Sequence, residues 1–92
     1  MKKRVHVFYT GRVQGVGFRI TAEETAQEYG AVGWVKNLRD GRVELVAEAA
    51  EEVLERFLKA IRYGSMKNFI EQVTISWSSA TDTFDEFEIR YY

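Results

Sequence analysis

The sequence predicts an α+β fold, a two-layer sandwich with two helices on one face of an antiparallel-rich sheet. Three observations support this prediction. The first two are periodicities in the sequence: apolar residues recur every three or four positions in two segments, as in helices, and every second position in five others, as in strands. The third is size, because a chain of 92 residues can build only one hydrophobic core. Each helical segment has a single apolar stripe, so both helices are expected on the same side of the sheet.

The first half of the chain is expected to contain a strand and a helix joined by a glycine-rich loop. Apolar residues alternate over Val5–Tyr9, which predicts a strand. The loop follows over Gly11–Gly17. A helix is predicted over Phe18–Tyr29, because its apolar residues fall on one helical face. Gly30 stands where a residue in the left-handed conformation commonly ends a helix.

The next segment is predicted to be a β-hairpin followed by the second helix. Two alternating stretches, Ala31–Leu38 and Arg42–Ala49, are joined by Arg39-Asp40-Gly41. An Asp-Gly pair is a strong hairpin signal, because glycine adopts positive φ without steric cost. The second helix is expected over Glu51–Tyr63, with Gly64 as its stop.

Two closing strands complete the expected order β-α-β-β-α-β-β. Alternation predicts them over Phe69–Trp77 and Phe84–Tyr91, with polar residues in the turn between them. This arrangement is ferredoxin-like, β-α-β-β-α-β with one further strand. The same architecture is shared by RNA-binding modules, metallochaperones and small hydrolases, so the fold alone does not determine the function.

The composition excludes several classes of protein. With no cysteine the chain has no disulfide, thiol nucleophile or iron–sulfur cluster, and His6 alone does not suggest a structural zinc site. A net charge of −1 provides no positive field to attract nucleic acid. The apolar stretch near the start is too short for a signal peptide or a membrane span. We therefore expect one cytoplasmic domain, residues 1–92, that uses no metal and no cofactor.

The loop between the first strand and the first helix is the segment that suggests chemistry. It reads Gly11-Arg12-Val13-Gln14-Gly15-Val16-Gly17-Phe18-Arg19. Backbone N–H groups at a helix start lack intrahelical partners and carry partial positive charge, so a curved run of them binds anions. Gly15 and Gly17 permit that curvature, and Arg19 adds a planar fork of donors. Taken alone, the loop is equally consistent with a plain turn and a surface arginine.

A second segment favours the anion-binding interpretation of the loop over the plain turn. It contains Gly33-Trp34-Val35-Lys36-Asn37, and Asp40-Gly41-Arg42-Val43 follows. Together the two segments resemble the paired signatures of the acylphosphatase family, Gly-x-Val-Gln-Gly-Val-x-Phe-Arg and Gly-aromatic-Val-Lys-Asn-x3-Gly-x-Val. The similarity covers essentially the whole chain. The sequence departs from the family pattern at Ala49 and at Ser65-Met66, which leaves the local strand end and the loop shape open.

The resemblance implies a metal-independent hydrolase that converts acyl phosphates into a carboxylate and inorganic phosphate. In this sequence it implies that Arg19 binds the phosphoryl group and that Asn37 orients the attacking water. It also implies that the loop backbone binds the phosphoryl oxygens, at Gln14, Gly15, Val16, Gly17, Phe18 and Arg19. The expected partners are a small-molecule acyl phosphate and inorganic phosphate, with no nucleic acid and no membrane. The chain is expected to be a monomer.

Two other functions remain open from the sequence. One is a non-enzymatic anion-binding module, resembling the acylphosphatase-like modules of carbamoyl-transfer maturation proteins; the short chain, with nothing fused to it, argues against this. The other is a single-stranded nucleic-acid binder, which the net charge disfavours, as does the expectation that most aromatic residues face the core. His6 is expected to be a sheet-face histidine, because it lacks the orienting partner that a catalytic base needs.

Overall fold

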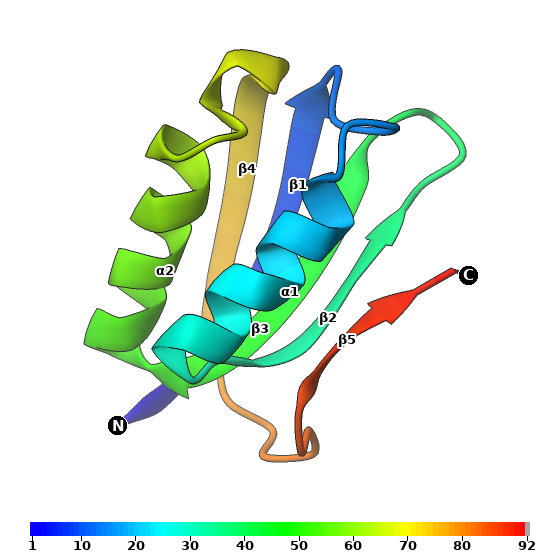
Figure 1. Ribbon diagram of the computed structural model, residues 1–92. Helices are drawn as coiled ribbons and strands as arrows, with labels where there is room; N and C mark the ends of the chain where they lie inside the picture. Colours follow the sequence, from blue (N-terminus) through cyan, green and yellow to red (C-terminus); the bar gives the residue numbers. More distant parts are fainter. Residues whose placement is uncertain (92) are drawn as a thin grey trace.

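The computed structural model describes residues 1–91 and confirms the predicted order of elements (Figure 1). The elements are β1 (Lys2–Gly11), α1 (Phe18–Tyr29), β2 (Val32–Asn37), β3 (Val43–Ala50), α2 (Glu51–Tyr63), the short 3-10 helix η1 (Lys67–Phe69), β4 (Ile70–Ser79) and β5 (Phe87–Arg90). Both α-helices have the predicted bounds. The departure from the family pattern at Ala49 does not disturb β3, because Ala49 pairs with Lys3 and the strand continues to Ala50.

The sheet has the order β4-β1-β3-β2-β5. All neighbouring strands are antiparallel except β2 and β5, which are parallel. Both helices cover one face: α1 packs on β2 and β5, while α2 packs on β3 and β1 (Figure 1). The predicted two-layer α+β sandwich is therefore confirmed.

The core lies between the helices and the covered face of the sheet. Its residues are those that the alternating and helical patterns predict, among them Val5, Val7, Leu45, Val35, Ala22, Ala26, Leu54, Phe57 and Ile61, all at most 2% exposed. The opposite face is open to solvent. His6 lies there and its Nε2 is 2.6 Å from Glu44 Oε2, so the histidine is a sheet-face residue as predicted.

The aromatic residues are less buried than the sequence pattern predicts. Trp77 and Tyr63 are 44% and 71% exposed. Trp77 occupies the helix-facing side of β4, but β4 is an edge strand and α2 packs mainly against β3 and β1. The edge of the sheet is therefore only partly covered, which alternation along the sequence cannot reveal.

The last strand is shorter than predicted, because β5 begins at Phe87 rather than at Phe84. The preceding segment is hydrogen-bonded to Glu48, a carboxylate on β3 that is only 2% exposed. Its Oε2 accepts from Thr81 N and Oγ1 at 2.9 and 2.8 Å, and its Oε1 accepts from Asp82 N at 3.0 Å. These hydrogen bonds compensate the burial of the Glu48 carboxylate and fix the turn before β5.

Glu48→Gln is expected to reduce the free energy of unfolding by about 1–3 kcal/mol at neutral pH. Both carboxylate oxygens accept from N–H donors, so the NH₂ of glutamine would face a donor instead of an acceptor. Denaturant unfolding would measure the difference. Glu24→Gln, which alters an exposed carboxylate on α1, is the control and should change stability little.

The same carboxylate predicts a dependence of stability on pH. Burial raises the pKa of Glu48, but hydrogen bonds from Thr81 and Asp82 and the charge of Arg4 outweigh it, so the pKa is lowered from 4.5. A lowered folded-state pKa means that the stabilisation is present above the unfolded-state value and is lost as pH falls through the folded-state value. The advantage of wild type over Glu48→Gln should be complete above pH 4.5, decline as the pH falls below that value, and be lost once the pH has passed the lowered folded-state pKa; an advantage that stayed constant throughout the acid range would contradict this.

Candidate active site

The loop after β1 turns the chain back toward the start of α1. Arg12 N donates to Phe69 O at 3.0 Å, which fixes the first residue of the turn against the end of η1. Gly15 and Gly17 have φ values of 77° and 82°, in the left-handed region that a side chain with Cβ rarely adopts. Gly17 is also the N-cap residue of α1. The predicted glycine-dependent curvature is therefore present at both positions.

The backbone donors of this loop have no acceptors within the protein. No N–H group from Gln14 to Ile20 donates to an acceptor in residues 1–91, and the first amide to do so is Thr21 N, which bonds Gly17 O at 3.0 Å. These donors stand at the N-terminus of a twelve-residue helix, where the helix dipole adds partial positive charge. The segment can therefore bind an anion with several N–H groups.

A hollow of about 210 Å³ lies between the loop and the end of β2. Of the residues predicted for the site, Gly15, Gly17, Phe18, Arg19 and Asn37 line it, together with Val13 and Ile20. Gln14 and Val16 of the predicted set do not line it. The structure therefore brings the two candidate catalytic side chains, which lie eighteen positions apart in the sequence, into one cavity.

Asn37 reaches this cavity because of strand alternation. It is the last residue of β2, on the same face as Gly33 and Val35, which point toward the helix layer. Its Oδ1 is buried and has no hydrogen-bond partner in residues 1–91. A buried carbonyl oxygen without a partner is uncommon in proteins and points to a bound water or ligand. Asn37 can thus accept a hydrogen bond from a molecule in the hollow.

Arg19, in the first turn of α1, provides the positive charge of the hollow. Its guanidinium carbon lies 5.1 Å from the centre of the Tyr91 ring, a cation–π contact. No carboxylate of residues 1–91 forms an ion pair with it. Tyr91 is a site residue that sequence reasoning missed, because its place in an alternating pattern marked it only as an apolar strand position.

Gln14 has a different role from the one that its sequence position suggests. Its side-chain Nε2 donates to Leu38 O at 2.7 Å and to Arg42 O at 2.9 Å, the two ends of the β2–β3 turn. Asn37 immediately precedes this turn. The Gln14 side chain therefore joins the loop to the hairpin that holds Asn37, and only its backbone remains available for an anion.

Gln14→Leu is expected to lower kcat by roughly 10–100-fold, because misplacing catalytic groups by about 1 Å has effects of that size. The substitution removes both hydrogen bonds to the hairpin but leaves the loop amides in place. Steady-state kinetics with the acyl phosphate that the sequence resemblance implies as substrate would show the loss, while the inhibition constant of inorganic phosphate should change much less. An equal loss in both quantities would instead indicate that the loop itself had collapsed.

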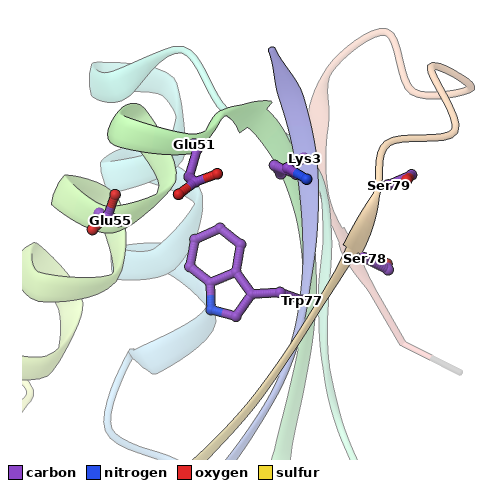
Figure 2. Close-up of a pocket in the computed structure, with 6 residues that line it drawn as sticks. All are labelled: Lys3, Glu51, Glu55, Trp77, Ser78 and Ser79. Carbon is purple, nitrogen blue, oxygen red and sulfur yellow. The ribbon is translucent and has the colours of Figure 1, made fainter.

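A larger hollow of about 480 Å³ lies at the opposite end of β1 (Figure 2). Glu51 and Glu55 of α2 face Trp77 of β4 across it, and Lys3 is nearby. It contains none of the predicted site residues, and two carboxylates disfavour a phosphate there. Size alone therefore does not identify the anion site.

Residues 1–91 also bear on metal binding and on membrane insertion. Within residues 1–91, no group of three or more histidine, cysteine, aspartate or glutamate side chains could hold a metal ion. In the same range, neither α1 nor α2 is long and apolar enough to cross a membrane.

An α+β sandwich whose strand–helix loop combines free amides and an arginine at one hollow is typical of proteins that bind a tetrahedral anion. The acylphosphatase family model matches residues 5–89. An acylphosphatase of Salinibacter ruber is 42% identical over 89 residues, covering 97% of this chain and 94% of the relative. The chain belongs to the acylphosphatase family.

Solved structures agree with this assignment. The crystal structure of acylphosphatase from Bacillus subtilis superposes with a TM-score of 0.90 at 36% identity, covering 97% of this chain and 99% of that one. A structure of HypF from T. kodakarensis matches 98% of this chain with a TM-score of 0.81 at 29% identity, but the match spans only 12% of that longer chain. The same fold therefore occurs both alone and within a larger protein.

Proposed function

We propose that the loop amides, Arg19 and Asn37 carry out the acylphosphatase reaction, the hydrolysis of a carboxyl–phosphate anhydride to a carboxylate and inorganic phosphate. The observation that carries this proposal is the shared hollow, which is lined by loop residues with unpaired amides, by Arg19 and by Asn37, whose Oδ1 has no partner in residues 1–91. On this proposal the chain acts as a single cytoplasmic domain and as a monomer. Its partners are a small acyl phosphate and inorganic phosphate.

The carboxylate leaving group lowers the catalytic requirements of the reaction. A carboxylate leaves with a conjugate-acid pKa of about 4–5, so no general acid is needed. The transition state of phosphoryl transfer is loose, with charge spread over the equatorial oxygens. Stabilising that charge is therefore the main task, and the guanidinium of Arg19 together with the amides from Gln14 to Arg19 is suited to it.

Asn37 would act on the nucleophile. An amide has no useful pKa and cannot serve as a base, but its Oδ1 can accept a hydrogen bond from a water molecule. Holding that water in line with the scissile P–O bond gives an orientational advantage. We propose that the proton of the water passes to a phosphoryl oxygen of the substrate. The histidine of the chain lies on the opposite face of the sheet and is paired with Glu44, so it takes no part.

The alternative of a nucleic-acid platform has less support. Aromatic rings do lie on the open face of the sheet, where Trp34 contacts the cations of Lys36 and Arg90. Each of these cations also has a carboxylate nearby, Glu44 at 3.8 Å and Glu88 at 2.9 Å. Paired charges leave little positive field for a phosphate backbone.

Benzoyl phosphate in the presence of a chelator tests the proposed function. The purified chain should hydrolyse it, and inorganic phosphate should inhibit competitively, because product and substrate would share the loop amides. Phosphate binding without turnover would support the non-enzymatic module instead. Turnover that disappears in chelator would contradict the mechanism, which assigns no step to a metal.

A further inference from the structure

A groove between α2 and β4 is not used by the proposed reaction. Its volume is about 260 Å³, and residues of both elements line it. β4 forms the edge of the sheet there and lies beside α2 (Figure 1). Apolar side chains form its walls, Leu58 from α2 and Val73 and Ile75 from β4. Ile75 is 41% exposed although it lies on the helix-facing side. The groove is slightly smaller than the roughly 300–1,000 Å³ of sites for drug-sized ligands, so it suits a small apolar body.

Tyr9 gives the groove a buried polar group. The residue lines the groove and is only 1% exposed, yet its hydroxyl has no hydrogen-bond partner in residues 1–91. Leaving a buried hydroxyl unpaired costs about 1–3 kcal/mol, and such groups in native proteins nearly always have a partner. The phenol can donate one hydrogen bond, so an acceptor bound in the groove that it lines would satisfy it.

Two cations line the same groove. Lys59 and Arg62 of α2 line the groove, and neither forms an ion pair with a carboxylate in residues 1–91. Burial raises the pKa of Tyr9, and the charge of Arg62 offsets part of that rise. Arg62 and Tyr9 both line the groove, so a ligand bound there can meet the guanidinium and the phenol together. Two unpaired cations and a phenol donor favour a negative charge.

We propose that this groove binds a small carboxylate that has an aliphatic or aromatic body. The carboxylate oxygens accept from Arg62 and from the Tyr9 hydroxyl, and the body packs against Leu58 and Ile75. The hollow of Figure 2, near the start of α2, does not suit such a ligand, because Glu51 and Glu55 would repel it. The site is also separate from the phosphate hollow, since the Tyr9 ring packs against Phe18 at 4.8 Å between the two.

Binding of 4-fluorobenzoate, followed by ¹⁹F NMR with and without saturating inorganic phosphate, tests the proposal. We expect saturable binding that phosphate does not displace. Arg62→Gln should weaken it about tenfold or more, since a charge-assisted hydrogen bond is lost, whereas Arg62→Lys should retain part of the affinity. Arg56→Gln removes the same charge from an exposed position on the same helix and should leave binding unchanged.

Further comparisons isolate the two polar contacts. Tyr9→Phe deletes only the hydroxyl and should weaken binding several-fold, and the neutral probe 4-fluorobenzyl alcohol should bind more weakly than the carboxylate. Displacement by phosphate would overturn the proposal by placing the probe in the phosphate hollow. Equal affinity for wild type and Arg62→Gln would also overturn it. Because the readout is binding, failure of the hydrolysis assay would leave these results interpretable.

Discussion

Arg19→Ala is expected to lower kcat/KM for benzoyl phosphate by about 10³–10⁵-fold, the range over which an arginine acts in phosphoryl transfer. The side chain enters the hollow from the first turn of α1 and has no carboxylate partner in residues 1–91. Its removal leaves the amides but takes away the one cation that lines the cavity within residues 1–91. Steady-state kinetics would measure the effect.

Arg19→Lys separates charge from geometry. An ammonium is a point charge, whereas the guanidinium presents parallel donors that match two phosphoryl oxygens. We therefore expect lysine not to restore activity. Arg12→Ala is the matched control, because Arg12 is an exposed arginine of the same loop, and it should change kcat by less than a few-fold. Near-normal activity of Arg19→Lys would show that only the charge matters.

Asn37→Ala is expected to lower kcat by about 10²-fold or more, since the orientation of the attacking water is lost. Phosphate binding should change little, because its donors are the loop amides and Arg19. The ratio of the two effects, from kcat and from the inhibition constant of phosphate, is the informative measurement. Asn68→Ala, at an exposed asparagine in η1, controls for loss of an amide elsewhere.

A preserved kcat in Asn37→Ala would remove the asparagine from the mechanism. Asn37→Asp provides a second test at the same position. Its carboxylate still accepts a hydrogen bond from water but repels a phosphate dianion in a cavity of about 210 Å³. We therefore expect Asn37→Asp to weaken phosphate inhibition, which Asn37→Ala should not do.

The fold could be predicted from the sequence because local periodicity determines it, whereas most residues of the hollow were implied by the resemblance to the paired family signatures. Alternation places Asn37 on the same face as Val35, and the glycines of the loop mark where the chain turns. The side-chain role of Gln14 could not be predicted, since its acceptors belong to a turn more than twenty positions away. The same holds for Tyr91, whose ring contacts Arg19 only after β5 pairs with β2.

The burial of side chains at the edge of the sheet was the other feature that the periodicity of the sequence predicted wrongly. Trp77 has the position of a core residue within its strand, but whether a helix covers it depends on how far α2 reaches across the sheet. The late start of the last strand, at Phe87 rather than at Phe84, has a similar origin. Glu48 and Thr81 are more than thirty positions apart, and their hydrogen bonds fix the turn that precedes β5.

The strand order also has a consequence for how the chain folds. Only β2 and β3 are neighbours both in the sheet and along the chain; every other strand pair joins distant segments. Domains dominated by such distant pairings fold slowly, on the scale of milliseconds to seconds. Since β5 completes the sheet beside β2, a nascent chain can close its sheet only after Phe87–Arg90 has emerged from the ribosome.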